Sequence, residues 1–570
     1  MPELLLGLDI GTSGVKAGIV DGDGHLIGLG RALHENDCPQ PGWVQCDPER
    51  WWQGVLASLR QACDEAGVRP SDIAAVGISV LFPCVVPLDR AGRALYPALL
   101  YCDRRSLAQA AAIEKAIPRA EYQSLIGNVL VPGTCAATSL AWIRDEQPET
   151  YRNAHAFGFA NTAISARLTG EFATDPTMVA LSGLVDIRDP WQWHAGLCAR
   201  LGLDGARLPR VAGAAQVLGT VTRAAAAETG LQAGTPVVCG CGDVPASAVG
   251  VGATAPPEGY SRIAPSGGYS ADSSASPPQG AKGGGRGTRE NQDQEALGPR
   301  PSGLAPSSPL GLAPPASSLA TVVYVAGSTD CVAVPLRAPT PDRRWVNSAY
   351  VPHGQWLPIG TTTSSGVSVE WFLREFLGQS GHEGVRAMTH LAEKSPLGSG
   401  RLLFVPYLQG ERTPIWDPQA RGIFFGLSST TTRGDLARAV LEGTAFGLRQ
   451  VIESLESVVG APVAEIRAVG GGTRNAFWNQ IKADVLRKRL AVLEFQETSS
   501  LGAALLGGLG AGIFPSFEAV AEVARASNRT QAVEPDESRS ARYDELYALF
   551  TQLYPATRSL AHALAQPAEG

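Results

Sequence analysis

The stretch LLLGLDIGTSGVKAGIVD, residues 4–21, decides the fold that we expect for this protein. An apolar run stops at Asp9, and a second apolar run ends at Asp21. Between the two runs stand four small residues, 11–14, and then Lys16. Two apolar segments on either side of a small-residue turn predict two buried strands joined by a tight turn.

The residues of this turn are suited to binding a phosphate group. Gly11, Thr12 and Ser13 can bring backbone N–H groups and hydroxyls close to it, and Lys16 can add a positive charge. Asp9, at the end of the first strand, can hold Mg²⁺ directly or through water. A plain hairpin in which Asp9 caps the turn would explain the same residues without any ligand.

Length and composition narrow the class of protein. A chain of 570 residues is too long for one core, so two or more domains are expected. The net charge of −7 weighs against a nucleic-acid or membrane partner. We find no apolar run long enough for a membrane span and no basic region before the first apolar run. Ten scattered cysteines without a Cys-x-x-Cys pattern indicate reduced thiols, so we expect a cytoplasmic protein.

Strand and helix patterns alternate along the chain, which predicts the α/β class. A third strand is expected at 73–80, and a strand at 235–243 precedes a small-residue segment. Helices are expected at 50–67, 106–117, 161–170, 433–458, 500–512 and 540–564.

A second stretch repeats the pattern of the opening hairpin. The strand TVVYV is followed by AGSTD, residues 326–330, and then by another apolar run. Gly327, Ser328 and Thr329 take the places of the small residues in the first turn. Two such hairpins, one early in each half, suggest duplicated domains that grip one polyphosphate from both sides.

A third glycine-rich turn lies between a strand and a helix in AVGGGTRNAFW, residues 468–478. The run Gly470, Gly471 and Gly472 can let a flat adenine ring approach the backbone. One glycine-rich turn is a weak signal, but three in this order are much stronger.

Asp243 is the candidate catalytic residue. It ends an apolar strand and begins the small-residue segment DVPASAVGVG. A carboxylate there can accept the proton of a hydroxyl that attacks phosphorus, and such general-base help is worth about 10² to 10⁴ in rate. Alternatively, Asp243 serves as the N-cap of the following helix, and the two roles are compatible.

These segments together resemble the FGGY carbohydrate kinases, within the actin-like ATPase superfamily, and among them most closely the xylulokinase branch. The resemblance covers nearly the whole chain except 257–320, a segment rich in Gly, Pro and Ser that we expect to be disordered. That segment is either a surface insertion or a gene-model error such as a retained intron. The segments that carry the resemblance include GLDIGTSGVKAGIVD at 7–21, LLYCDRRS at 99–106, GCGDVPASAVGVGA at 240–253, GERTPIWDPQARGIFFGL at 410–427 and VGGGTRNAFWNQIKAD at 469–484.

The resemblance implies two actin-like, ribonuclease H-like domains with a cleft between them. An N-terminal sugar-binding domain would span 1–249, and a C-terminal nucleotide-binding domain would span 250–570, interrupted by the insertion. The implied ligands are ATP, Mg²⁺ and a small sugar or polyol, and the resemblance allows a homodimer. The resemblance implies that Asp9 binds the metal, that Asp243 is the general base, and that Asp103 and Asp243 contact the sugar. It implies that the phosphates are bound by Gly11, Thr12, Ser13, Gly327, Ser328 and Thr329, and that the nucleotide pocket is formed by Gly470, Gly471, Gly472 and Asn475.

The sugar side of this chain departs from the family pattern. Phe82 and Pro83 stand where xylulokinases carry Met-His, so we expect these two residues at the sugar. Tyr101-Cys102 replaces Trp-Asn, and Val244 replaces the Asn that commonly follows the base. The expected acceptor is a ketopentose such as D-xylulose. Ribulose, another ketose, or a polyol such as glycerol or erythritol are alternatives, and so is an actin-like protein that binds ATP without catalysis.

Overall fold

Two strands joined by a short turn open the chain, as the sequence predicts. The computed structural model describes residues 3–256, 321–340, 342–460, 462–463 and 465–565, and the disorder predicted for 257–320 lies outside these residues. Strands β1 (Leu4–Ile10) and β2 (Gly14–Val20) pair antiparallel and place Asp9 opposite Lys16. The backbone N–H of Gly11 donates to the carbonyl of Gly14 at 2.9 Å and closes the turn.

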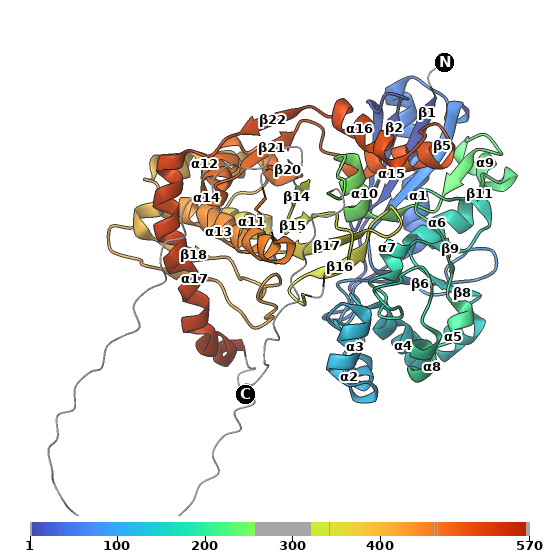
Figure 1. The fold of residues 1–570 in the computed structure, drawn as a ribbon, viewed down its shortest axis with the longest axis horizontal. Helices are drawn as coiled ribbons and strands as arrows, with labels where there is room; N and C mark the ends of the chain where they lie inside the picture. The colour runs from blue at the N-terminus through green and yellow to red at the C-terminus, as the bar shows by residue number, and fades with distance from the viewer. Residues whose placement is uncertain (1–2, 257–320, 341, 461, 464, 566–570) are drawn as a thin grey trace, which may run out of the picture. The chain divides into compact units, whose positions relative to one another are not determined.

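The opening hairpin is an inner part of the first large sheet (Figure 1). Strand β5 (Ile73–Val80) pairs parallel with β1, and it matches the third strand that the sequence predicts. The sheet has the order β11 (Val217–Thr220), β12 (Pro236–Val238), β5, β1, β2, β3 (Leu26–Leu33), with β13 (Cys241–Gly242) also paired to β5.

The second large sheet repeats this arrangement. Strands β14 (Val322–Ala326) and β15 (Asp330–Ala333) form an antiparallel hairpin, and β14 pairs parallel with β20 (Glu465–Val469). The order is β16 (Val346–Ala349), β17 (Trp356–Thr361), β15, β14, β20, β21 (Arg489–Leu493), β22 (Thr530–Val533). Each half of the chain therefore builds the same motif, a hairpin whose first strand pairs parallel with a later strand.

Three smaller sheets complete the strands of the described residues. They are β4 (Gln45–Cys46), β7 (Ala98–Leu100), β6 (Cys84–Leu88) and β8 (Ala156–Gly158) in one sheet, β9 (Ala173–Thr174) with β10 (Arg210–Val211), and β18 (Leu403–Val405) with β19 (Ile423–Phe425).

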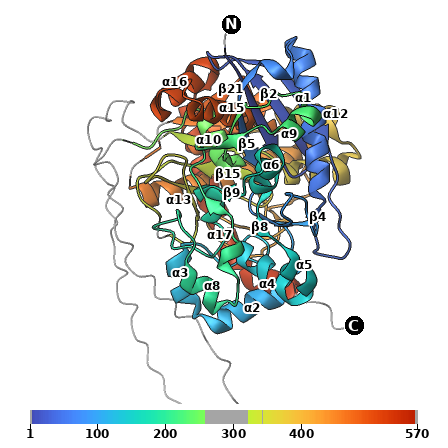
Figure 2. The same ribbon diagram turned by 90° about the vertical axis from the view of Figure 1, so that its right-hand side faces the viewer.

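Helices surround both large sheets (Figures 1 and 2). Those of the first half are α1 (Pro48–Ala66), α2 (Leu107–Ala116), α3 (Arg119–Ile126), α4 (Ala136–Glu146), α5 (Pro148–Asn153), α6 (Ala160–Thr169), α7 (Pro176–Val179), α8 (Ala195–Arg200), α9 (Arg223–Thr229) and α10 (Asp243–Gly250). Those of the second half are α11 (Gly366–Phe372), α12 (Gly381–Lys394), α13 (Arg433–Val459), α14 (Ala476–Leu486), α15 (Thr498–Gly510), α16 (Phe517–Ser527) and α17 (Glu537–Ala565).

The first long helix, α1, begins and ends at capping residues that can be recognised in the sequence. The side chain of Asp47 accepts a hydrogen bond from the backbone N–H of Glu49 and caps the start of α1. Gly67 ends the helix at φ 68°, a left-handed conformation that glycine adopts without strain. The apolar face of α1 packs against β3 and buries Trp51 and Trp52 in the core.

The strand predicted at 235–243 is broken in the structure. It forms β12 and β13 as two short strands, because Gly240 takes a φ of 74° between them. A Cβ atom on Gly240 would lie 2.1 Å from the carbonyl oxygen of Ile78 in β5. Only glycine therefore fits at this position, where the backbone lies against β5.

Helix α15 belongs to the second half of the chain but packs on the first sheet, against β1 and β5 (Figures 1 and 2). A Cβ atom on Gly7 would lie 1.9 Å from the carbonyl oxygen of Ser500, and one on Gly77 would lie 1.7 Å from that of Ala503. Glycine at these positions lets the helix touch the strands directly. The small-residue helix that the sequence predicts for close packing is therefore confirmed, with the first sheet as its partner.

None of the helices in the described ranges is long and apolar enough to cross a membrane. All ten cysteines are free thiols.

Candidate active site

A cavity of about 390 Å³ lies beside the opening hairpin. It is lined by Asp9, Gly11, Thr12, Ser13, Gly14, Val15, Lys16, Arg31, Ala32, Leu33, Asp243, Val244, Ser247, Val325 and Ser499. Val325 belongs to strand β14 of the second sheet, so both halves of the chain contribute to the wall. The structure thus brings the predicted metal ligand, the first phosphate hairpin and the predicted base into one cavity.

Asp9 is buried and held on both sides at the end of β1. The hydroxyl of Ser79 donates to its Oδ1, and the hydroxyl of Ser499 donates to its Oδ2, both at 2.8 Å. Ser79 comes from the adjacent strand β5, whereas Ser499 lies in the first turn of α15. Each carboxylate oxygen thus accepts one hydrogen bond, and Asp9 lines the cavity with its other lone pairs still available.

Lys16 is placed between two carboxylates. Its Nζ atom lies 2.7 Å from Oε2 of Glu497 and 3.9 Å from Oδ2 of Asp9. Burial is the largest single effect and lowers the pKa of Lys16, but Asp9 and Glu497 together outweigh it. The pKa of Lys16 is therefore raised, and the ammonium stays charged. Sequence reasoning missed Glu497 and Ser499, because nothing near 497–499 shows that this segment returns to the first hairpin.

Asp243 is the first residue of α10, and Gly242 is the N-cap. Its Oδ1 atom accepts the backbone N–H of Val244 at 2.8 Å. Burial and, after it, the nearby carboxylate of Asp9 raise the pKa of Asp243 to about 7. Because Gly242 is the N-cap, the N-cap alternative for Asp243 is wrong by one position. The carboxylate of Asp243 lines the cavity, and its pKa suits it to accept a proton near neutral pH.

The donor set around this cavity fits a hard divalent cation. Asp9 supplies carboxylate oxygens, which are the ligands that Mg²⁺ prefers. Two hydroxyls already fix its carboxylate. Asp243 lines the same cavity, but its raised pKa suits it to accept a proton, so Asp9 is the candidate metal ligand.

A second cavity, of about 280 Å³, joins the other two glycine-rich turns. It is lined by Gly327, Ser328, Gly366, Val369, Glu370, Val385, Met388, Thr389, Leu441, Gly471, Gly472, Asn475 and Trp478. The turn after β14 and the turn after β20 are neighbours because β14 and β20 pair in parallel. Five of the predicted nucleotide-site residues thus line one cavity.

Three of the predicted nucleotide-site residues have structural contacts of their own. The carbonyl of Thr329 accepts the N–H of Gly327 at 3.1 Å and shapes the second hairpin. Gly470 takes a φ of 104°, and its N–H donates to Oε1 of Gln496 at 2.6 Å. Neither Thr329 nor Gly470 lines the cavity. Asn475 does line it, and its Oδ1 atom caps α14 by accepting the N–H of Trp478.

The sugar-side residues divide into two groups. Phe82 packs against Gly242, so closely that a Cβ atom there would lie 2.7 Å from the ring, and it therefore lies next to Asp243. Pro83 is buried beside it. Asp103 is 1% exposed, and its carboxylate accepts the N–H of Val44 at 2.6 Å and forms an ion pair with Arg105 at 2.9 Å. Asp103 lines neither cavity.

Tyr101 is a site residue that sequence reasoning noted only as a departure from the family pattern. The side chain of Thr12 in the first hairpin and the charge of Asp243 both act on the pKa of the Tyr101 hydroxyl. Burial raises the pKa of Tyr101, so the phenol stays neutral at physiological pH. The signal in the sequence was its place in LLYCDRRS, two residues before Asp103.

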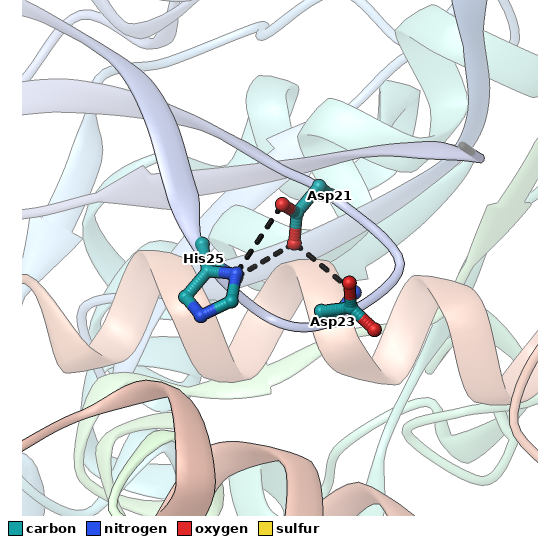
Figure 3. A group of neighbouring side chains, drawn as sticks. All are labelled: Asp21, Asp23 and His25. Carbon is teal, nitrogen blue, oxygen red and sulfur yellow. Dashed lines mark hydrogen bonds and ion pairs between the residues drawn. The ribbon is translucent and has the colours of Figure 1, made fainter. Parts of the chain in front are cut away.

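One exposed group of side chains has the composition of a metal site but lies elsewhere. Asp21, Asp23 and His25 form the turn between β2 and β3 (Figure 3). Oδ1 of Asp21 accepts the backbone N–H groups of Asp23 and His25 at 3.0 and 2.9 Å. These bonds explain the group as a side-chain-closed turn, and we assign it no further role.

The family comparison covers most of the chain. The N-terminal domain of the FGGY family of carbohydrate kinases matches residues 4–250, and its C-terminal domain matches residues 322–511. Among characterised relatives, the xylulose kinase of Escherichia coli is 26% identical over 97% of this chain and 98% of its own length. The glycerol kinase of Thermococcus gammatolerans is 27% identical over 91% of this chain and 92% of its own length.

Solved structures show the same fold. The xylulose kinase of Rhodospirillum rubrum has a TM-score of 0.79 at 26% identity and covers 98% of this chain and all of its own. The glycerol kinase of Plasmodium falciparum has a TM-score of 0.76 at 20% identity, which is a likeness of fold alone. The predicted fold class, two α/β domains of the actin-like ATPase type, is confirmed. The chain belongs to the FGGY family of carbohydrate kinases, which are sugar phosphotransferases that use ATP.

Proposed function

We propose that this carbohydrate kinase transfers the γ-phosphoryl group of ATP to a hydroxyl of a ketopentose such as D-xylulose. The observation that supports it is the placement of Asp243 in one cavity with Asp9 and the first phosphate hairpin. The xylulose kinases among the relatives, which align over nearly their whole length, favour this acceptor.

The residues of the two cavities would have different roles in the transfer. Asp243 accepts the proton of the acceptor hydroxyl as the hydroxyl oxygen bonds to the γ-phosphorus. The bond between that phosphorus and the β–γ bridging oxygen breaks, and ADP leaves. The first hairpin (Gly11, Thr12, Ser13) and Lys16, together with the second hairpin (Gly327, Ser328, Thr329), bind the phosphates.

Asp9 would hold Mg²⁺, which neutralises phosphate charge when bound. The cavity formed by Gly471, Gly472 and Asn475 would take the adenine end of the nucleotide. Closure of the two halves around both substrates would exclude water and limit ATP hydrolysis. We also propose that the enzyme is cytoplasmic and forms a homodimer.

A polyol acceptor is the second candidate. Phe82 presents an aromatic ring next to Asp243, and Pro83 offers no hydrogen-bonding side chain, so the site lacks the polar pair that the xylulokinase pattern places there. The glycerol kinases among the relatives favour a smaller, neutral acceptor in this case.

The test is ADP release from Mg-ATP by the purified protein with a panel of ketoses, aldoses and polyols. We expect one acceptor to stimulate ADP release strongly and Asp243→Ala to abolish the stimulation. Best turnover with glycerol or erythritol would favour the polyol kinase. No stimulation by any acceptor while ADP still binds would contradict the proposal.

A further inference from the structure

A buried lysine lies under the nucleotide cavity and has no role in the mechanism above. Lys482 is 1% exposed on helix α14, one turn after Trp478. Its Nζ atom lies 3.8 Å from the ring centroid of Trp478 and 5.2 Å from that of Tyr324. Trp478 lines the nucleotide cavity, so the ammonium stands directly behind the cavity wall.

A buried carboxylate acts on the ammonium of Lys482. Asp330 follows the second hairpin directly and is 1% exposed. Its Oδ1 atom accepts the hydroxyl of Tyr324 at 2.9 Å, whereas Oδ2 has no hydrogen-bond partner among the described residues. Nζ of Lys482 also lacks a hydrogen-bond partner there. The two groups are thus electrostatic neighbours that do not form a direct bond.

Each charge helps to keep the other ionised. Burial lowers the pKa of Lys482 to about 8, and Asp330 acts against that shift. Burial raises the pKa of Asp330, and Lys482 acts against that shift in turn. Asp330 is the charged group that acts on Lys482, and the ammonium lies over the rings of Tyr324 and Trp478.

Such a pair is not explained by stability. Replacing a buried ion pair by apolar residues of similar volume is often neutral or stabilising. Burying an ammonium without a hydrogen bond is costlier still. The position of the pair offers another explanation, because Asp330 is attached to the phosphate hairpin and Lys482 to the helix that Asn475 caps.

We propose that Lys482 is a positioning residue for the phosphates of the nucleotide. Its positive charge acts on them through the hairpin formed by Gly327, Ser328 and Thr329, and Asp330 is the counter-charge that limits this attraction. The inference rests on the proposed function, since it takes a nucleoside phosphate as the ligand of this cavity. It assigns a long-range electrostatic role to a residue that touches no ligand.

Nucleotide binding without an acceptor tests this inference. Titration calorimetry with ADP and with adenosine measures the phosphate contribution as the ratio of the two dissociation constants. We expect K482M to weaken ADP binding about tenfold, the order that one charge acting across several ångströms of protein gives. Adenosine binding should stay within about twofold, since adenosine carries no phosphate.

The opposite change should strengthen the phosphate contribution. D330N removes the counter-charge, which also lowers the pKa of Lys482, so the measurement is made at pH 6, where the ammonium stays protonated. We expect the ratio of the adenosine to the ADP dissociation constant to rise about threefold. The double variant D330N/K482M should lie between the wild type and K482M. The control K488M removes a lysine that pairs with Glu456 at 2.7 Å, and it should leave both ligands unchanged.

An equal loss of ADP and adenosine binding in K482M, or no loss of either, would overturn the inference. If K482M does not fold, the ratio in D330N decides, and an unchanged ratio would overturn the inference. The outcome is separate from that of the proposed function. ADP that binds as expected in a protein without acceptor-stimulated turnover would support the role of Lys482 and contradict the proposed reaction.

Discussion

Asp243 combines a catalytic position with an environment that sets the pH at which it can act. Its raised pKa comes first from burial and then from the negative charge of Asp9. The residue is therefore a base only above that pKa, and it costs the folded protein stability when it is charged. Both consequences can be measured.

The first prediction concerns turnover. Below pH 7, we expect kcat/KM for the acceptor to fall about tenfold for each pH unit, since only the deprotonated Asp243 can accept the proton. Asp243→Asn should lower kcat by about 10² to 10⁴ and remove this acid limb. The measurement is ADP release between pH 5.5 and 8.5. A wild-type profile that is flat below pH 7 would contradict the role of Asp243 as the base.

The second prediction concerns stability. The pKa of Asp243 is higher in the folded than in the unfolded protein, so its favourable contribution is complete below the unfolded value of about 4 and is lost as the pH rises through 7. Asp243→Asn should therefore raise the melting temperature at pH 8 and change it little at pH 4.5. Asp189→Asn, at an exposed position, is the control. A variant that melts below the wild type at pH 8 would show that the carboxylate is not under strain.

At the scale of single elements, helix α15 connects the fold to the site. Its glycines and those of the strands beneath it allow direct contact with β1 and β5. Its first turn carries Ser499, which fixes Asp9, and Glu497 just before it holds Lys16. The packing of one helix thus sets the geometry of the opening hairpin.

The third prediction tests this connection. In Gly77→Ala the new Cβ atom would lie 1.7 Å from the carbonyl oxygen of Ala503, so α15 must move. We expect a loss of about 3 kcal/mol or more, at the upper end of the range for overpacked cores, together with reduced turnover. Thermal unfolding and ADP release measure the two effects. The control is Gly205→Ala, where the new Cβ atom would lie no closer than 3.6 Å to its nearest neighbour, so neither stability nor turnover should change. Full stability in Gly77→Ala would contradict the close packing.

At the scale of the whole molecule, the two halves repeat one motif and share the cavity around Asp9. Side chains also join them elsewhere. The amide of Asn128 accepts the N–H of Asn347 at 2.8 Å and donates to its carbonyl at 3.0 Å. The family matches end at residue 250 and resume at 322. The boundary between domains at 249 and 250 stays a prediction.

The fourth prediction concerns the segment between these matches. Joining Gly259 directly to Thr321 would restore an uninterrupted family pattern. We expect this shortened chain to fold and to keep its acceptor-stimulated turnover, because long surface insertions change loop-closure entropy only slightly. Melting temperature and kcat of the two forms provide the comparison. Loss of turnover in a shortened chain that still melts cooperatively would show that 260–320 contributes to the reaction.

Local sequence determined much of this protein. Apolar runs interrupted by small residues predicted both hairpins, the glycine-rich turn before α14 and the small-residue helix α15, because each of these features depends on neighbours in the chain. The same motifs predicted the family and the two-domain α/β fold. They also placed Asp243 at the end of a strand, where a catalytic carboxylate was expected.

Only the tertiary structure decided which distant residues complete the sites. Ser499 reaches Asp9 from 490 positions away, and Asp103 forms a buried ion pair with Arg105. Lys482 and Asp330 become neighbours only because β14 and α14 pack together. Periodicity and turn chemistry describe contacts between near neighbours in the chain. They hold no information on which buried charge will face which, since that depends on how complete elements pack.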